Sequence, residues 1–171
     1  MTSFCMLDFV KFTGTPLPLG FSHISSVHDF VIIEVKTETD LLRAVKNSRV
    51  DIVFNVETLF SRDALHSKNS GLNQVILCHA AQNNVAIGFN FSLLLRASDA
   101  QRPLLLGRMI QNVLLCRKYK VRMVLSSLAQ EPYAMRDAKD LLAFARVLGM
   151  TGKEAQEALS FTKKQKTVRI Q

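Results

Sequence analysis

Short apolar runs alternate with amphipathic segments along most of the chain. The apolar runs are rich in β-branched and aromatic residues and predict five strands, at 5–12, 30–35, 50–56, 85–91 and 121–126. Apolar residues at helical spacing predict five helices, which begin near residues 37, 72, 101, 137 and 151. Residues 13–29 hold two prolines and two glycines without helical periodicity and are expected to be irregular.

Three helix boundaries have specific signals. Thr37 is a suitable N-cap residue and is followed by acidic residues, which favour the first turn. Gly149 is expected to end the helix at 137–148. Thr151 and Glu154 have the spacing of a capping box and should open the last helix.

The helix at 101–119 is the longest and is expected to follow a loop that contains Arg96, Asp99 and Arg102. Its predicted buried face consists of Leu105, Leu106, Met109, Ile110, Val113 and Leu114. The polar residues Arg108, Gln111, Asn112 and Lys118 are expected mostly on the other face.

Strands that alternate with helices indicate parallel strands joined by right-handed crossovers. A TIM-barrel-like (β/α) fold and a doubly wound sheet both satisfy this order of elements. We expect one α/β domain over 1–161, followed by a basic and flexible C-terminal tail at 162–171.

The composition is that of a soluble globular protein, with 48% hydrophobic and 21% charged residues. No stretch approaches the roughly 20 apolar residues that span a bilayer, so we expect a cytoplasmic protein with no membrane partner. The three cysteines, Cys5, Cys78 and Cys116, are far apart and form no CxxC pair. They indicate neither a zinc site nor a disulfide framework.

Charge is distributed unevenly along the chain. The formal net charge is +8, yet residues 1–100 contain eight Lys/Arg against nine Asp/Glu. Residues 101–171 contain fourteen against five. This asymmetry favours a polyanionic partner that binds mainly through the C-terminal half, although an ordinary basic surface would show the same totals.

Five basic residues follow predicted strand ends and should lie on one rim, because loops after parallel strands meet at one edge. They are Arg62, Lys68, Arg96, Arg102 and Arg136. Arginine predominates, and its planar guanidinium matches phosphate oxygens. A second predicted RNA-binding cluster lies at the opposite end of the sheet and consists of Arg117, Lys118, Lys120 and Arg122. The C-terminal tail adds three predicted RNA-binding lysines, Lys163, Lys164 and Lys166.

Motifs for catalysis are absent from the sequence. It contains no GxGxxG, no GxxxxGK[ST] and no GxSxG. Its four histidines form no HxH pair, so no metal site is predicted. One catalytic alternative stays open: a small barrel enzyme could hold a phosphorylated metabolite with the rim arginines and use Asp8 or Glu34 as a base.

Four segments in order resemble a known family: RVDIVFNVE, SGLNQVILCHAAQNNVAIGFNFSLLL, LLGRMIQNVLLCRKYKVRMVLSS and AMRDAKDLLAFARVLGMTGKEAQEALS. Over roughly 49–160 they resemble archaeal ribonuclease P protein component 3, whose family includes the thirty-kilodalton subunit of the eukaryotic enzyme. Each segment alone is a weak signal, whereas their order and spacing together are specific.

The resemblance implies a barrel related to PHP-type metal-dependent hydrolases but without their metal ligands. It implies a non-catalytic subunit that binds and supports the catalytic RNA in transfer-RNA 5′ maturation. The implied partners are ribonuclease P RNA, pre-tRNA, protein component 2 and other ribonuclease P proteins. The protein would bind no cofactor itself, and the RNA catalyst would require Mg²⁺.

Two features depart from the family pattern. Residues 13–29 replace the expected first crossover helix, so one N-terminal barrel unit is expected to be reduced. Gly88 stands where the family usually has Glu, which puts any role of that carboxylate in doubt for this chain.

Overall fold

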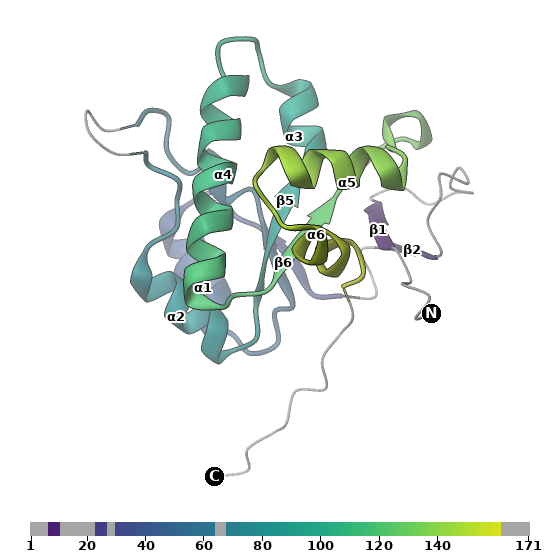
Figure 1. The fold of residues 1–171 in the computed structure, drawn as a ribbon. Coiled ribbons are helices and arrows are strands. Elements are labelled where there is room, and N and C mark those ends of the chain that lie inside the picture. Colours follow the sequence, from purple (N-terminus) through teal and green to yellow (C-terminus); the bar gives the residue numbers. More distant parts are fainter. Residues whose placement is uncertain (1–6, 11–22, 27–29, 64–67, 162–171) are drawn as a thin grey trace.

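The computed structural model describes residues 7–10, 23–26, 30–63 and 68–161 (Figure 1). Strands β1 (Leu7–Val10) and β2 (His23–Ser26) form a parallel pair. A four-stranded parallel sheet has the order β3 (Ile32–Glu34), β4 (Ile52–Phe54), β5 (Ala86–Asn90) and β6 (Met123–Ser126). The helices are α1 (Glu38–Lys46), α2 (Gln74–Gln82), α3 (Phe91–Arg96), α4 (Arg102–Tyr119), α5 (Ala138–Val147) and α6 (Gly152–Leu159).

Consecutive strands of the larger sheet are neighbours, and β1 lies close to β6. A doubly wound sheet would instead reverse its strand order at a switch point. The strands therefore follow a TIM-barrel-like α/β arrangement, as predicted, with helices packed outside them (Figure 1). Within the described residues, no helix is both long and apolar enough to cross a membrane.

Side chains alternate between the two faces of each strand and build two apolar clusters. The outward face, which includes Val53, Ile87 and Leu125, packs against the helices in the larger cluster. The inward face supplies Ile52, Phe54, Ala86 and Val124, which meet Leu128 and Phe161 in the smaller cluster. The described part of the barrel interior is therefore filled by apolar side chains.

Gly88 belongs to this inward face, and the packing explains its departure from the family pattern. It pairs in register with Phe54 of β4, which is fully buried. A Cβ atom at Gly88 would overlap the Phe54 ring. The ring thus occupies the space that a carboxylate side chain would need.

The predicted helix boundaries are confirmed. The Thr37 hydroxyl accepts a hydrogen bond from the Asp40 backbone N–H at 3.1 Å. Gly149 ends α5 with a φ of +83°, a conformation that glycine adopts without strain. Thr151 and Glu154 form the reciprocal bonds of a capping box at 3.2 and 2.7 Å.

Two predictions about loops are wrong. Residues 23–26 form β2 inside the segment expected to be irregular, because a parallel strand is defined by its pairing with β1 as well as by its own sequence. The rest of 13–29 lies outside the described residues. Residues 91–96 form α3 rather than a loop, since β5 passes directly into a helix at Asn90.

The predicted buried face of α4 is also partly wrong. Arg108 and Asn112 are buried together with Leu105, Met109, Val113 and Cys116. Leu106 and Ile110 are half-buried, and Leu114 is 55% exposed. The helix is rotated toward its two polar residues because both find hydrogen-bond partners inside the molecule.

Candidate functional site

The loop between β4 and α2 leaves the carboxyl edge of the sheet. It begins at Asn55, which has a φ of +66°, and continues as a short 3-10 helix over Val56–Thr58. Arg62 and Lys68, two of the predicted rim residues, lie on this loop and are exposed. Residues 64–67 lie outside the described residues.

A buried guanidinium fixes the start of this loop. Arg108 projects from α4 and is only 1% exposed. Its Nη1 donates to the backbone carbonyls of Glu57 and Phe60 at 2.8 and 2.6 Å. Its Nε and Nη2 lie 2.9 and 2.8 Å from one carboxylate oxygen of Asp63.

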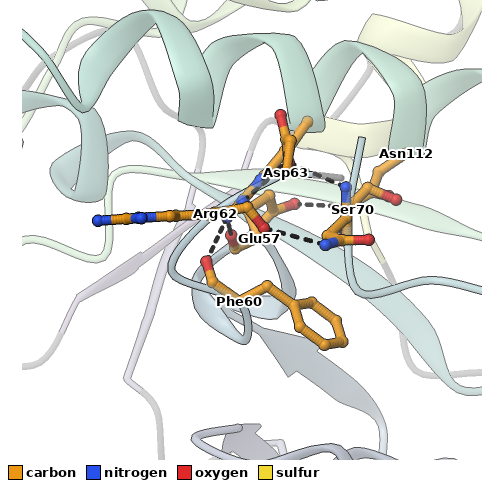
Figure 2. Close-up of polar contacts among 8 residues, drawn as sticks. Glu57, Phe60, Arg62, Asp63, Ser70 and Asn112 are labelled. Atoms are coloured by element: carbon orange, nitrogen blue, oxygen red, sulfur yellow. Dashed lines mark hydrogen bonds and ion pairs between the residues drawn. The ribbon is translucent and has the colours of Figure 1, made fainter. Parts of the chain in front are cut away.

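Figure 2 shows the loop gathered around these contacts, while the side chain of Arg62 extends away from them. Arg62 forms no ion pair or side-chain hydrogen bond with any other described residue, and its own backbone carbonyl accepts a bond from Asn69 at 2.9 Å. The buried network therefore holds the backbone of the loop and does not engage the Arg62 guanidinium.

Glu57 forms a second buried anchor. It is fully buried, and its Oε1 accepts a hydrogen bond from Asn112 Nδ2 at 3.1 Å. Asn112 also donates to the Ser70 carbonyl at 3.1 Å, so one side chain joins both ends of the loop to α4. Burial raises the pKa of Glu57 to about 7, although hydrogen bonds and Arg108 act in the opposite direction.

Asp63 behaves differently because it stays closer to solvent. Its partial burial disfavours the charged form, but the Asn69 backbone N–H and the Arg108 guanidinium outweigh this and lower the pKa of Asp63. Lys68 adds to the same effect. The Lys68 ammonium lies along α4 at Gly107, where an added Cβ would be 3.1 Å from Nζ.

The α3–α4 hairpin supplies the neighbouring part of the rim. Arg102 donates to the carbonyls of Leu94 and Ala97 at 3.2 and 3.1 Å and pairs with Asp99 at 3.1 Å. These bonds satisfy carbonyls at the end of α3, where a cation is also favoured by the helix dipole. Arg96 is exposed and forms no ion pair or side-chain hydrogen bond with the described residues.

Arg136 completes the predicted rim on the loop that follows β6. Its Nη1 donates to the Met135 carbonyl at 3.0 Å, and its guanidinium lies 5.9 Å from the centre of the Phe91 ring. The structure thus places all five predicted residues after the carboxyl ends of β4, β5 and β6. Their contact with RNA stays a prediction.

The second predicted cluster lies at the opposite edge and is largely engaged in internal contacts. Arg117 binds both oxygens of Glu154 at 2.7 and 2.8 Å and donates to the Gly149 carbonyl at 2.7 Å. Arg122 stacks 4.0 Å from the centre of the Phe161 ring. Lys118 and Lys120 are exposed, whereas Lys163, Lys164 and Lys166 lie outside the described residues.

The candidate acid–base residues are not assembled into a catalytic pair by any described contact. Glu34 is exposed and accepts a hydrogen bond from Asn55 Nδ2 at 2.8 Å. Asn55 in turn accepts from Asn90 at 3.0 Å, which links the ends of three strands. The side chain of Asp8 is outside the described set, and the described residues contain no cluster of three potential metal ligands among His, Cys, Asp and Glu.

Sequence reasoning missed the Arg108 and Asn112 anchors, although a signal was present. The two residues are four positions apart, on one face of α4, and each directly precedes a buried apolar residue, Met109 or Val113. Long polar residues at buried positions are rare unless paired. The sequence therefore contained the evidence for buried anchors, but their partners could be identified only from the fold.

Three comparisons place this arrangement among known proteins. The profile of a family described as RNase P subunit p30 matches residues 14–166. Ribonuclease P protein component 3 of Methanosarcina mazei is 38% identical over 132 residues, which cover 77% of this chain and 52% of that protein. The protein of the same name from Thermococcus gammatolerans is 34% identical, over 67% of this chain and 53% of the relative.

The chain thus spans about half the length of the curated relatives that it matches. A chain in a cryo-EM structure of archaeal ribonuclease P with mature tRNA superposes with a TM-score of 0.70. The match covers 89% of this chain and 86% of that one at 19% sequence identity, which shows a shared fold.

Proposed function

Because this chain belongs to the RNase P subunit p30 family, we propose that it acts as a protein subunit of ribonuclease P and binds the RNA of that enzyme. The observation that carries the proposal is the loop after β4. Buried Arg108 holds its backbone, and the Arg62 side chain projects from it without an ion pair or hydrogen bond to the described residues.

A preorganised cation suits a phosphate backbone for a physical reason. Binding loses less conformational entropy when the loop is already ordered, and each neutralised phosphate releases counterions. Arg96, on the adjacent hairpin, is a second exposed guanidinium that forms no ion pair with the part of the chain that the structure describes. We therefore assign Arg62, Lys68 and Arg96 as the main RNA contacts, with Arg102 and Arg136 in supporting positions.

The remaining parts of the proposal follow from the family. This chain would be non-catalytic, and the RNA with its Mg²⁺ would cleave the 5′ leader of pre-tRNA. Protein component 2 and other ribonuclease P proteins would bind elsewhere on its surface. The protein would hold no cofactor and would reside in the cytoplasm.

The test compares two triple variants with equal loss of charge. Arg62→Ala, Lys68→Ala and Arg96→Ala remove the rim cations. Arg43→Ala, Lys46→Ala and Arg49→Ala remove three exposed cations in and after α1, which leads back to the amino edge of β4. Affinity for the cognate ribonuclease P RNA is measured by filter binding from about 50 to 200 mM salt.

We expect the rim variant to bind more weakly and to lower the slope of log affinity against log salt by about 2 to 3. The α1 variant should behave nearly as the unmodified protein. If both variants weaken binding equally, binding depends on net charge alone and the rim assignment is wrong. If the unmodified protein binds no RNA at low salt, the proposed function itself is wrong.

A further inference from the structure

A cavity of about 290 Å³ opens between the loop after β4 and the α3–α4 hairpin. Phe60 contributes from the loop, Leu93 from α3, and Leu104 and Leu105 from α4. Its lining is therefore mostly apolar, and its size is at the lower end of the range for small-molecule pockets.

Polar groups also line the cavity. The hydroxyl of Ser61 and the amide of Gln101 can exchange hydrogen bonds with a ligand, and the Arg96 guanidinium provides positive charge. Arg62 follows Ser61 directly in the chain. The ligand that suits this arrangement has a flat apolar part with polar edges and an attached anion.

Both walls of the cavity are held in place before any ligand binds. Arg108 fixes the loop through the carbonyls of Glu57 and Phe60. Arg102 fixes the end of α3 through the carbonyls of Leu94 and Ala97. A preformed site binds with a smaller entropy cost than one that must be ordered.

We propose that this cavity receives one unstacked nucleobase, whose adjoining phosphate binds Arg96 and Arg62. The inference rests on the proposed function, and it adds base recognition to a surface otherwise suited to backbone contacts. Proteins commonly bind unpaired RNA bases in this way, with apolar side chains against the ring and polar groups at its edge.

A nucleotide fits the surroundings better than a protein side chain does. Two large exposed apolar side chains belong to the α3–α4 hairpin, Leu95 on α3 and Leu114 on α4, and neither lines the cavity. The others among the described residues lie on other elements: Val31, Val75, Tyr133 and Val147. A protein interface would extend the apolar surface around the opening. Here the lining instead includes the exposed Arg96, and Arg62 directly follows the lining residue Ser61 in the chain.

The test fills the cavity from one wall. Leu104→Trp enlarges a lining side chain, and Leu114→Trp makes the same change at an exposed position of the same helix that does not line the cavity. Each full-length protein is bound to the cognate ribonuclease P RNA. Affinity is measured at fixed salt, and base reactivity is mapped with dimethyl sulfate and carbodiimide.

We expect the unmodified protein to protect a discrete unpaired base, and Leu104→Trp to abolish this protection and weaken binding by about 10-fold. Leu114→Trp should leave both unchanged. If Leu104→Trp loses its helical circular dichroism, Ser61→Phe fills the cavity from the exposed loop and replaces it. Unchanged affinity and protection in a folded, filled variant would overturn the base pocket while leaving RNA binding by the rim intact.

A second arm separates RNA from free nucleotides as the source of the base. The four ribonucleoside 5′-monophosphates are titrated into the protein, and NMR shifts of the methyl groups lining the cavity are followed. Shifts that Leu104→Trp abolishes, without RNA binding by the unmodified protein, would support a nucleotide pocket and reject the proposed function. Absence of both responses would overturn both proposals.

Discussion

Replacing Glu57 by Gln should remove a specific dependence of stability on pH. Glu57 is fully buried, and its pKa is about 7 in the folded protein against 4.5 for an unperturbed glutamate. Between these values the unfolded chain has released its proton while the folded protein retains it. The free energy of unfolding therefore falls as pH rises through this window, and it levels off above pH 7.

The size of the effect follows from the shift. One pKa unit corresponds to about 1.4 kcal/mol, so Glu57 costs the folded state about 3 kcal/mol once pH exceeds 7. Gln keeps the shape and the oxygen that accepts from Asn112. Its amide also adds N–H donors to a buried network in which the Ser70 hydroxyl and Asn112 Oδ1 have no hydrogen-bond partner among the described residues. Glu57→Gln should thus be more stable than the unmodified protein at pH 8, and the difference should disappear near pH 4.5.

Urea denaturation followed by circular dichroism, from pH 4.5 to 8 at constant ionic strength, measures this difference. Groups that titrate alike in both proteins cancel when the two profiles are subtracted. Glu131→Gln, a change of the same type at an exposed position, should give a flat difference profile. Parallel profiles for Glu57→Gln and the unmodified protein would refute the assignment of a neutral, buried carboxyl group.

Three further substitutions test the packing around the site by urea denaturation. Arg108→Met should cost about 3–5 kcal/mol by leaving a carboxylate and two carbonyls without their partner; a loss below about 1 kcal/mol would contradict the anchor. Gly88→Ala should cost about 1–3 kcal/mol because its Cβ overlaps the Phe54 ring, and an unchanged midpoint would show that the interior is loose. Arg117→Ala should cost no more than about 1 kcal/mol at pH 7, since the pair is partly exposed. It should also reduce the loss of stability between pH 4.5 and 2, because Arg117 holds the pKa of Glu154 at about 2; an unchanged acid profile would count against the pair.

Local signals in the sequence predicted the elements well wherever the deciding interactions are local. The capping box at Thr151 and Glu154 lies within one helical turn, and the bonds form as the spacing indicates. β2 escaped notice because its pairing with β1 is not local. The same reason explains Arg108, whose three partners lie between 45 and 51 positions earlier in the chain.

The charge totals of the sequence do not show which basic residues the fold engages internally. The surplus lies in residues 101–171, yet Arg108, Arg117 and Arg102 of that half are engaged by internal carboxylates and carbonyls. At the rim, the guanidinium groups without an ion pair among residues 7–10, 23–26, 30–63 and 68–161 belong to Arg62 and Arg96. Both lie in the half of the chain with a net charge of −1.

A cation already bound to a carboxylate must give up that partner before it can neutralise a phosphate. Its contribution to the free energy of RNA binding is therefore smaller than that of a cation without an ion pair. On the proposed function, the RNA interface would therefore depend on which cations have no internal ion pair. Arg108 and Arg102 would then contribute indirectly, because their hydrogen bonds fix the two segments that carry Arg62 and Arg96. Substituting an internally paired arginine should therefore reduce RNA affinity only if the substitution disorders the segment that the arginine holds. An arginine that contacts RNA directly should instead reduce the affinity when it is substituted, even if the fold is unchanged.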